Sequence, residues 1–242
     1  MENFKLRASA AGKLMTGTIG LTDAQQKTFY EYSERAAGNG KPLTENMNAT
    51  LQDLIQKKNN PELSQTAKSF LEEWYKSELY GIRKQIKSKY IEKGLENEDA
   101  AIDFMISALD ISFAIKNEER FNDDFFTGEP DLIVDGVVYD TKCSWDCFTF
   151  PLFETENPNK DYEYQLQVYM HLTGCKKAVL AYVLTNTPEH MTWEQQNDYS
   201  ELADELRIKT FEFEYDENII DELKIRIQLA KNYLETIKIK NR

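Results

Sequence analysis

Histidine and cysteine are scarce in this chain, and their scarcity limits the chemistry that it can carry. The 242 residues include two histidines, His171 and His190, and three cysteines. Two histidines give little support for histidine-based acid–base catalysis. Three cysteines, an odd number, fit a reducing cytoplasm better than a disulfide framework. We therefore expect a cytoplasmic protein whose chemistry depends on other side chains.

The same small set of cysteines argues against two kinds of metal centre. Iron–sulfur clusters take four cysteine ligands as a rule, one more than this chain has. A zinc site would need the loosely spaced residues Cys143, Cys147, His171 and Cys175, with His171 in the middle of an expected helix. The simpler interpretation is that Cys143 is a small residue beside Lys142.

Several sequence signals are absent and exclude further classes of protein. No apolar run approaches the length that crosses a bilayer. The opening residues, MENFKLR, contain no apolar segment and no small-residue cleavage site, so we expect no secretory signal. Neither a Walker-type phosphate loop nor a Gly-x-Ser-x-Gly elbow occurs. We therefore expect no ATP hydrolysis by this chain.

Length and composition are those of a folded globular protein. Hydrophobic residues make up 41% of the chain and charged residues 29%, which separates it from disordered sequences. A chain of 242 residues buries a sizeable core. We expect one α/β domain over residues 1–242, with a mainly helical part at 1–92 and the core at 93–242.

The net charge of −13 disfavours a nucleic-acid partner if it is taken as a bulk property. A local groove of Lys and Arg can nevertheless bind phosphates, and a bound metal reverses the sign of an acidic site. Basic residues are dense at 76–89. That run is either a helix surface that faces a duplex or an ordinary solvated helix face.

Helix caps and apolar patterning predict the elements along the chain. We expect helices at 22–37, 45–58, 162–172, 193–205 and 217–239, and a long helical region at 64–108 that breaks near Gly94. We expect strands at 113–115, 118–122, 178–184 and 209–215, and a loop at 146–160. The apolar run at 178–184 is typical of a buried central strand.

The most informative segment is Gly128-Glu129-Pro130-Asp131, followed by Asp140-Thr141-Lys142. Between them lie two apolar stretches separated by Asp135-Gly136, a dipeptide that tolerates positive φ, so the segment predicts a β-hairpin. Side chains alternate along a strand, so Asp140 and Lys142 point to one face and Thr141 to the other. Asp131 stands where the first strand begins.

This hairpin brings two carboxylates and one ammonium group to one end. Mg²⁺ prefers oxygen ligands and keeps several waters, so two carboxylates and a substrate phosphate make a sufficient site. A lysine beside the metal can orient or deprotonate the attacking water and counter the charge of a phosphate. A lone Asp-x-Lys is more often part of a solvated hairpin, but here it follows a strongly apolar strand and a Pro-Asp at a strand start.

This combination resembles the PD-(D/E)xK nuclease superfamily. Upstream, Gly94 and Glu98 match the Gly-x-x-x-Glu on the helix before the nuclease hairpin in the lambda-exonuclease and YqaJ-like viral recombinase family. The resemblance implies that Glu98 binds metal with Asp131 and Asp140. Glu96 is the alternative to Glu98. Glu129 is an extra carboxylate, either a bystander or an alternative ligand.

Two further motifs support the resemblance. Gln165 and Tyr169 are four residues apart on one helix face and resemble the Q-x-x-x-Y of related nucleases, where the Gln lies beside the catalytic centre and helps to hold the strand. Arg7 and Ser9 resemble the opening segment that contacts the 5′ phosphate of a duplex end. The ordinary alternatives are a core tyrosine with a surface Gln165, and a capped helix with small packing residues.

The resemblance implies a restriction-endonuclease-like α/β core and a Mg²⁺-dependent DNA exonuclease, with Mn²⁺ as a substitute. Catalysis would involve Glu98, Asp131, Asp140, Lys142 and Gln165. It also implies action on linear double-stranded ends from 5′ to 3′, a homotrimer, an annealing protein as partner and a role in phage recombination within a bacterial host. Two alternatives remain open: a structure-specific or restriction-type endonuclease, and a nuclease-fold binding module without catalysis.

Overall fold

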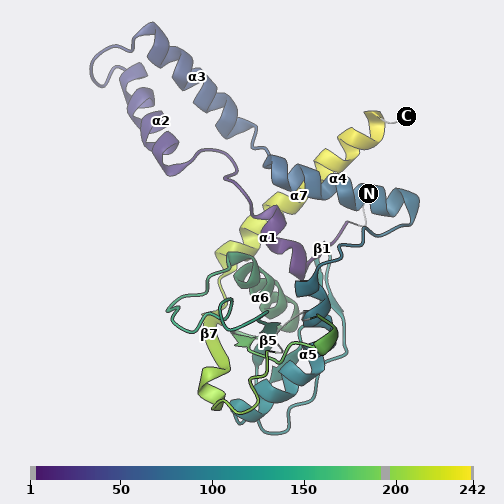
Figure 1. Cartoon of the computed structure of the whole chain (residues 1–242). Helices are drawn as coiled ribbons and strands as arrows, with labels where there is room; N and C mark the ends of the chain where they lie inside the picture. The colour runs from purple at the N-terminus through teal and green to yellow at the C-terminus, as the bar shows by residue number, and fades with distance from the viewer. Residues whose placement is uncertain (1–3, 192–196, 241–242) are drawn as a thin grey trace. The chain divides into compact units, whose positions relative to one another are not determined.

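The computed structural model describes residues 4–191 and 197–240, which form two compact units. The larger unit contains Ile82–Lys224 and the segment that ends at Gly12. The smaller unit contains Lys13–Gly81 and the chain from Ile225 onward. Figure 1 traces the elements of both. No helix in the described part of the chain is long and apolar enough to span a bilayer.

A four-stranded mixed sheet forms the centre of the larger unit. Its order is β4 (Leu132–Val134), β5 (Val137–Cys143), β6 (Lys177–Val183), β7 (Ile208–Glu214). β5 and β6 are parallel, and the outer pairs are antiparallel. The expected hairpin is confirmed as β4 and β5, with Asp135 and Gly136 at φ 50° and 77° in the turn. The expected central strand is β6.

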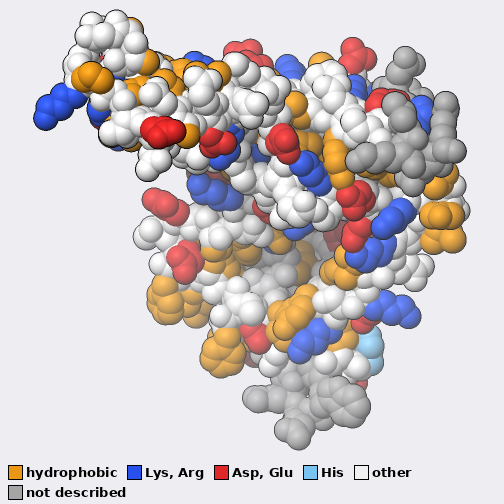
Figure 2. Space-filling model, turned by 90° about the horizontal axis from the view of Figure 1, so that it is seen from above, with side chains coloured by type: hydrophobic (Ala, Val, Ile, Leu, Met, Phe, Trp, Pro, Cys, Tyr) orange, Lys and Arg blue, Asp and Glu red, His pale blue; other side chains and the backbone are white. Residues whose placement is uncertain are grey.

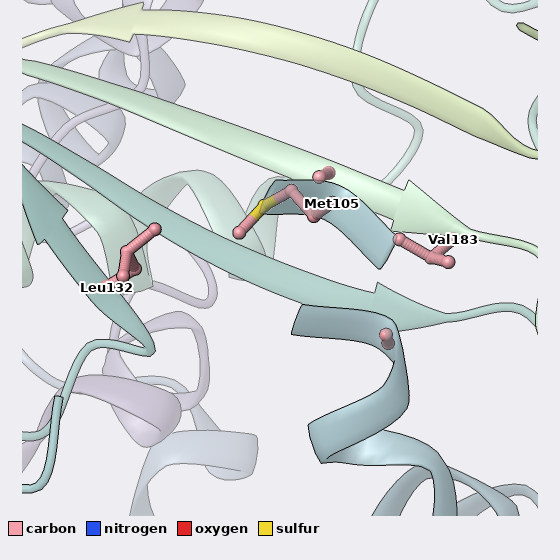
Figure 3. Close-up of a cluster of buried hydrophobic side chains, with 5 residues drawn as sticks. Met105, Leu132 and Val183 are labelled. Atoms are coloured by element: carbon pink, nitrogen blue, oxygen red, sulfur yellow. The ribbon is translucent and has the colours of Figure 1, made fainter. Parts of the chain in front are cut away.

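Helices cover both faces of this sheet because each face carries alternate apolar side chains. α5 (Lys89–Ala108) packs against one face, where Ala101 and Met105 join Leu132, Ala181 and Val183 in a buried cluster (Figure 3). α6 (Lys160–Thr173) connects the parallel strands and packs on the opposite face. The expected mixed α/β fold, with a central sheet flanked by helices, is confirmed.

Lys93 fixes α5 to the ends of two strands. Its side chain is only 1% exposed, and its ammonium group donates to the carbonyls of Ser144, Trp145 and Thr185 at 2.9, 2.8 and 2.8 Å. Burial lowers the pKa of Lys93 to about 8. These bonds hold the helix at the end of the sheet where β5 and β6 finish.

A second, smaller sheet lies in the same unit. It has the order β1 (Leu6–Arg7), β3 (Phe126–Gly128), β2 (Phe121–Asn122), with β1 parallel and β2 antiparallel to β3. The 3₁₀ helix η1 (Ala8–Ala10) follows β1 and packs on α6. This sheet brings the start of the chain to the segment that precedes the hairpin.

The smaller unit is helical. It contains α2 (Asp23–Ala36), α3 (Glu45–Asn59), α4 (Gln65–Tyr80) and the later part of α7 (Glu217–Lys240), while α1 (Ala11–Leu14) runs from one unit into the other. The hydroxyls of Thr22, Thr44 and Ser64 cap α2, α3 and α4. The boundaries expected for the helices at 22–37 and 45–58 agree with α2 and α3 within one residue.

The break expected near Gly94 is wrong. α5 runs through Gly94 without interruption, and α4 ends instead at Gly81, which takes the left-handed conformation at φ 66°. Packing of the later turns of α5 outweighs the modest cost of one glycine in a helix. Residues 82–88 are not helical, so the expectation of one basic helix surface over 76–89 is also wrong.

Two other expected elements differ from the structure. The strand at 113–115 is absent because Phe113 adopts φ 56°, outside the strand region. Of the strand expected at 118–122, only β2 (Phe121–Asn122) is present. The helix expected at 193–205 falls partly on residues 192–196, outside the described residues. Residues 197–203 are irregular, because the Asn186 and Asp198 side chains bond to backbone N–H groups there; only the short 3₁₀ helix η3 (Asp204–Leu206) follows.

The remaining predictions for this region agree with the structure. Residues 146–159 form a loop of turns, and α6 starts at Lys160, two residues before the expected start. β7 and α7 match the strand and helix expected near the end of the chain within one residue. Another short 3₁₀ helix, η2 (Glu189–Met191), lies in the segment that joins β6 to β7.

Candidate active site

Asp140 and Lys142 form a pair on β5, in which the acid is buried and the lysine is partly exposed. Asp140 is 2% exposed, and the Lys142 ammonium group donates to its Oδ2. The two side chains lie on the same face because they are two residues apart on a strand. The Lys142 ammonium also lies 4.9 Å from the centre of the Tyr162 ring. The pair thus joins a buried carboxylate to an ammonium group that solvent can reach.

The charges around this pair come from the predicted acidic residues. Burial raises the pKa of Asp140 to about 6; Lys142 opposes that shift, and the negative charges of Asp131 and Glu98 add to it. The pKa of Lys142 is raised, because attraction by Asp140 and Asp131 outweighs the cost of its burial. Lys142 is therefore an ammonium ion at neutral pH, and the three carboxylates lie close enough to influence one another.

Asp131 is held by the strand that follows it in the hairpin. Its Oδ2 accepts two hydrogen bonds from Thr141, one from the backbone N–H and one from the hydroxyl, both at 2.7 Å. Both bonds engage the same oxygen, Oδ2, and leave Oδ1 for another ligand. No sequence motif predicts a role for Thr141. Its position between two site residues on a strand, facing the start of β4, is the signal that identifies it.

Of the three alternative glutamates, Glu98 lies with the site. Its Oε1 accepts a 2.7 Å bond from Lys116, and it lines a cavity together with Asp131. Glu96 pairs with His190 at 3.2 Å instead. Glu129 lines the same cavity but is paired with Arg120 at 2.6 Å.

The cavity beside Asp131 has a volume of about 580 Å³ and gathers most of the predicted residues. Its lining includes Arg7, Ser9, Glu98, Asp131 and Tyr169, and the basic residues Lys116 and Arg120. Arg7 and Ser9 are exposed, whereas their neighbours Leu6 and Ala8 are buried. The beginning of the chain therefore presents one cationic and one hydroxyl side chain to a cavity with an acidic wall.

Gln165 connects Asp140 of this pair to the wall of the cavity. Its side-chain amide donates to Asp140 Oδ1 at 3.3 Å and to the Tyr169 hydroxyl at 2.9 Å, as their spacing on one face of α6 permits. Gln165 is 7% exposed and Tyr169 5%, so neither is a surface residue. The structure brings all the predicted site residues into one connected site: Arg7, Ser9, Glu98, Asp131, Asp140, Lys142, Gln165 and Tyr169.

Gly128 allows Tyr169 to take this place. A Cβ added at Gly128 would lie 2.7 Å from the Tyr169 ring and 3.1 Å from the Ala8 side chain. Any larger residue there would push the ring away from Gln165. The glycine at the start of the Gly-Glu-Pro-Asp segment is therefore required by close packing.

The residues fit a hard divalent cation by the chemistry of their donors. Glu98, Asp131 and Asp140 offer carboxylate oxygens, the ligands that Mg²⁺ prefers. Within residues 4–191 and 197–240, no three acidic, histidine or cysteine side chains are already gathered into a metal cage. Protein donors hold the carboxylates instead: Lys116 holds Glu98, Thr141 holds Asp131, and Lys142 holds Asp140.

The cysteines and His171 do not form a site. Both ring nitrogens of His171 are engaged, Nδ1 with the Tyr215 hydroxyl and Nε2 with Asp123, each at 3.1 Å. Cys175 is buried beyond the end of α6. The disfavoured zinc set is therefore not assembled among the described residues.

Basic side chains do not gather into a large field on the face shown in Figure 2. Lys and Arg side chains are interspersed there with Asp and Glu. At the cavity itself, the cationic side chains are those of Arg7, Lys116 and Arg120.

Solved structures of two exonucleases share this fold, although no protein-family model and no curated protein matches the chain. The phage related exonuclease from Haemophilus somnus 129PT has a TM-score of 0.73 and 25% identity, over 99% of this chain and 97% of that one. The alkaline exonuclease from Laribacter hongkongensis has a TM-score of 0.59 and 17% identity, over 98% and 93% of the two chains. The structure of LHK-Exo in complex with dAMP has a TM-score of 0.60 and 17% identity, over 99% of this chain and 94% of that one.

These similarities extend over nearly the whole of each chain, so they include both compact units. The Laribacter structures support the fold alone, because their identity to this chain is 17%. The resemblance seen in the sequence is confirmed at the level of the fold: this chain has the fold of the phage related exonuclease and of the alkaline exonuclease.

Proposed function

We propose that this protein is a Mg²⁺-dependent DNA exonuclease that degrades linear double-stranded DNA from its ends. The observation that carries the proposal is the buried Asp140 beside the Lys142 ammonium, with Asp131 and Glu98 near enough to raise the pKa of Asp140. Such a cluster of like charges is costly unless a cation offsets it. The exonuclease folds of the solved relatives supply the reaction class.

The carboxylates of Glu98, Asp131 and Asp140 would hold Mg²⁺ or Mn²⁺. The ion would supply Lewis-acid polarisation of the phosphodiester and offset the charge that develops on it. Lys142 carries a positive charge at neutral pH, so its role is to orient the attacking water and to stabilise the phosphate charge. Gln165 keeps the Asp140 carboxylate in one orientation through its 3.3 Å bond.

Arg7 and Ser9 would bind the 5′ phosphate of the duplex end. An arginine fork and a hydroxyl suit a terminal phosphate, and both line the cavity next to Asp131. This placement favours cleavage from 5′ to 3′. The dAMP complex of the Laribacter enzyme supports a site of nucleotide size in this fold. A homotrimer, an annealing protein as partner and a role in phage recombination in a bacterial cytoplasm remain parts of the proposal that rest on the resemblance.

Linear duplex DNA labelled at the 5′ or the 3′ end tests the proposal in the presence of Mg²⁺. We expect early release of the 5′ label, an intact covalently closed circle, and no cleavage by the Lys142→Ala variant. Lys177→Ala is the matched control, since Lys177 is an exposed lysine at the opposite end of the parallel strand pair. Cleavage of the circle would assign the chain to endonucleases, and inactivity of the wild type on every substrate would assign it to binding modules.

A further inference from the structure

Lys116 occupies an unusual place for a lysine beside a candidate metal site. Its ammonium group bonds to Glu98 Oε1 at 2.7 Å and to Asp99 Oδ1 at 2.6 Å. These two bonds raise the pKa of Lys116, so it stays charged over the physiological range. One of the three carboxylates proposed to bind metal thus shares the ammonium group of a protein side chain with Asp99.

The position of Lys116 is set by its neighbour Asn117. The Asn117 backbone N–H donates to the Asp131 carbonyl at 2.8 Å, and its side chain donates to the Pro130 carbonyl at 3.0 Å. A third bond, to the Glu119 carbonyl at 2.9 Å, closes the turn. The loop that carries Lys116 is therefore tied to the same backbone segment that presents Asp131.

The ammonium group of Lys116 can change its position, because its side chain is partly exposed. Its side chain is 39% exposed and that of Glu98 is 43% exposed, so the pair lies on the cavity surface and its bond is weak in water. Lys116 lines the cavity with Arg7, Ser9 and Asp131. A flexible four-carbon stem lets the ammonium reach other groups along this wall while Asn117 holds the backbone.

We infer that Lys116 stands in for the divalent cation at Glu98 in the metal-free protein and binds a DNA phosphate once the cation takes that carboxylate. The inference rests on the proposed function, because it requires both a metal and a phosphate in this cavity. The exchange leaves each charged group with a partner of opposite sign: the cation replaces the ammonium at Glu98, and the ammonium pairs with the incoming phosphate. Lys116 is thus a phosphate-positioning residue, separate from Lys142.

Calorimetry with Mn²⁺ alone tests the first half of the exchange. Removal of the competing ammonium in Lys116→Ala should tighten Mn²⁺ binding about two- to fivefold, the range expected for an exposed ion pair. Lys116→Arg should bind Mn²⁺ about as the wild type does. The Lys177→Ala control should not differ from the wild type. Weaker or unchanged Mn²⁺ binding by Lys116→Ala would overturn the stand-in role.

Fluorescence anisotropy of a 5′-phosphorylated duplex in Ca²⁺ tests the second half without relying on cleavage. We expect Lys116→Ala to weaken DNA binding about five- to tenfold and to lower the slope of log affinity against log salt by about one. Unchanged affinity and slope would overturn the phosphate role. If the wild type binds Mn²⁺ and cuts DNA while Lys116→Ala behaves identically, this inference alone fails; if the wild type does neither, the proposed function fails with it.

Discussion

The Gln165 amide lies between Asp140 and Tyr169 and bonds to both, at 3.3 Å to the carboxylate and 2.9 Å to the hydroxyl. This arrangement places an uncharged donor next to a buried acid. A carboxylate in the same position would repel Asp140 and favour its protonated form. The identity of residue 165 therefore controls the charge of the site.

Gln165→Glu should shift the acidic limb of the pH–activity profile upward by about one unit, because the added negative charge raises the pKa of Asp140 further. The profile of kcat/KM against pH, measured with Mg²⁺, gives the shift. Tyr169→Phe is the control, since it keeps Gln165 and adds no charge. A profile for Gln165→Glu with an unmoved limb would contradict the placement of Gln165 beside the titrating acid.

Mn²⁺ affinity should depend on pH in a way set by Asp140. Burial raises the pKa of Asp140 to about 6, so a cation must displace a proton below that pH and none above it. We expect affinity to fall about tenfold per pH unit below pH 6 and to level off above pH 7. Calorimetry at pH 5 to 8, in buffers of different ionisation enthalpy, measures affinity and proton release together. Affinity that is flat from pH 5 to 8 would contradict Asp140 as a ligand.

The Thr141 hydroxyl should contribute to metal binding although it need not touch the metal. It donates to Asp131 Oδ2 at 2.7 Å and orients that carboxylate. Thr141→Val keeps the shape but loses the donor, and should lower Mn²⁺ affinity about 10- to 100-fold. Thr141→Ser keeps the hydroxyl and should remain near the wild type. Equal affinities for the two variants would show that the backbone N–H of residue 141 is sufficient.

Gly128→Ala should lower the free energy of unfolding by about 1–3 kcal/mol, because the new methyl group would lie 2.7 Å from the Tyr169 ring. Urea denaturation measures the change. Gly94→Ala is the opposite control: apart from its chain neighbours and the nearby backbone of α5, no described residue has an atom within 4 Å of an added Cβ there. It should stabilise the protein by about 0.5–1 kcal/mol. Stability of Gly128→Ala equal to that of the wild type would mean that Tyr169 moves without cost.

Lys93 should make stability depend on pH above neutrality. Its folded pKa, about 8, is below the ordinary value of 10.5, so the unfolded chain binds more protons between these two pH values. Its contribution to the free energy of unfolding therefore rises with pH across that window. We expect the urea midpoint of the wild type to rise relative to that of Lys93→Met as the pH increases through this window, in measurements from pH 7 to 11. Parallel curves would show that Lys93 titrates as an exposed lysine does.

Local patterns in the sequence were enough for the hairpin and its charged residues. Alternating apolar residues around Asp135-Gly136 determine two strands and their register, which in turn places Asp140 and Lys142 on one face. Helical spacing likewise determines that Gln165 and Tyr169 share a face. These relationships depend on a few neighbouring residues, so short-range stereochemistry decides them.

The partners of those residues depended on the tertiary structure. Glu98 and Glu96 are both acidic residues on one helix, and only the packing of α5 shows that Glu98 meets Lys116 in the cavity while Glu96 meets His190. The burial of Lys93 depends on where two strands end, far along the chain. Such contacts join residues that are distant in the sequence. The periodicity of a helix or strand determines which of its residues share a face, but not which residues of another element they contact.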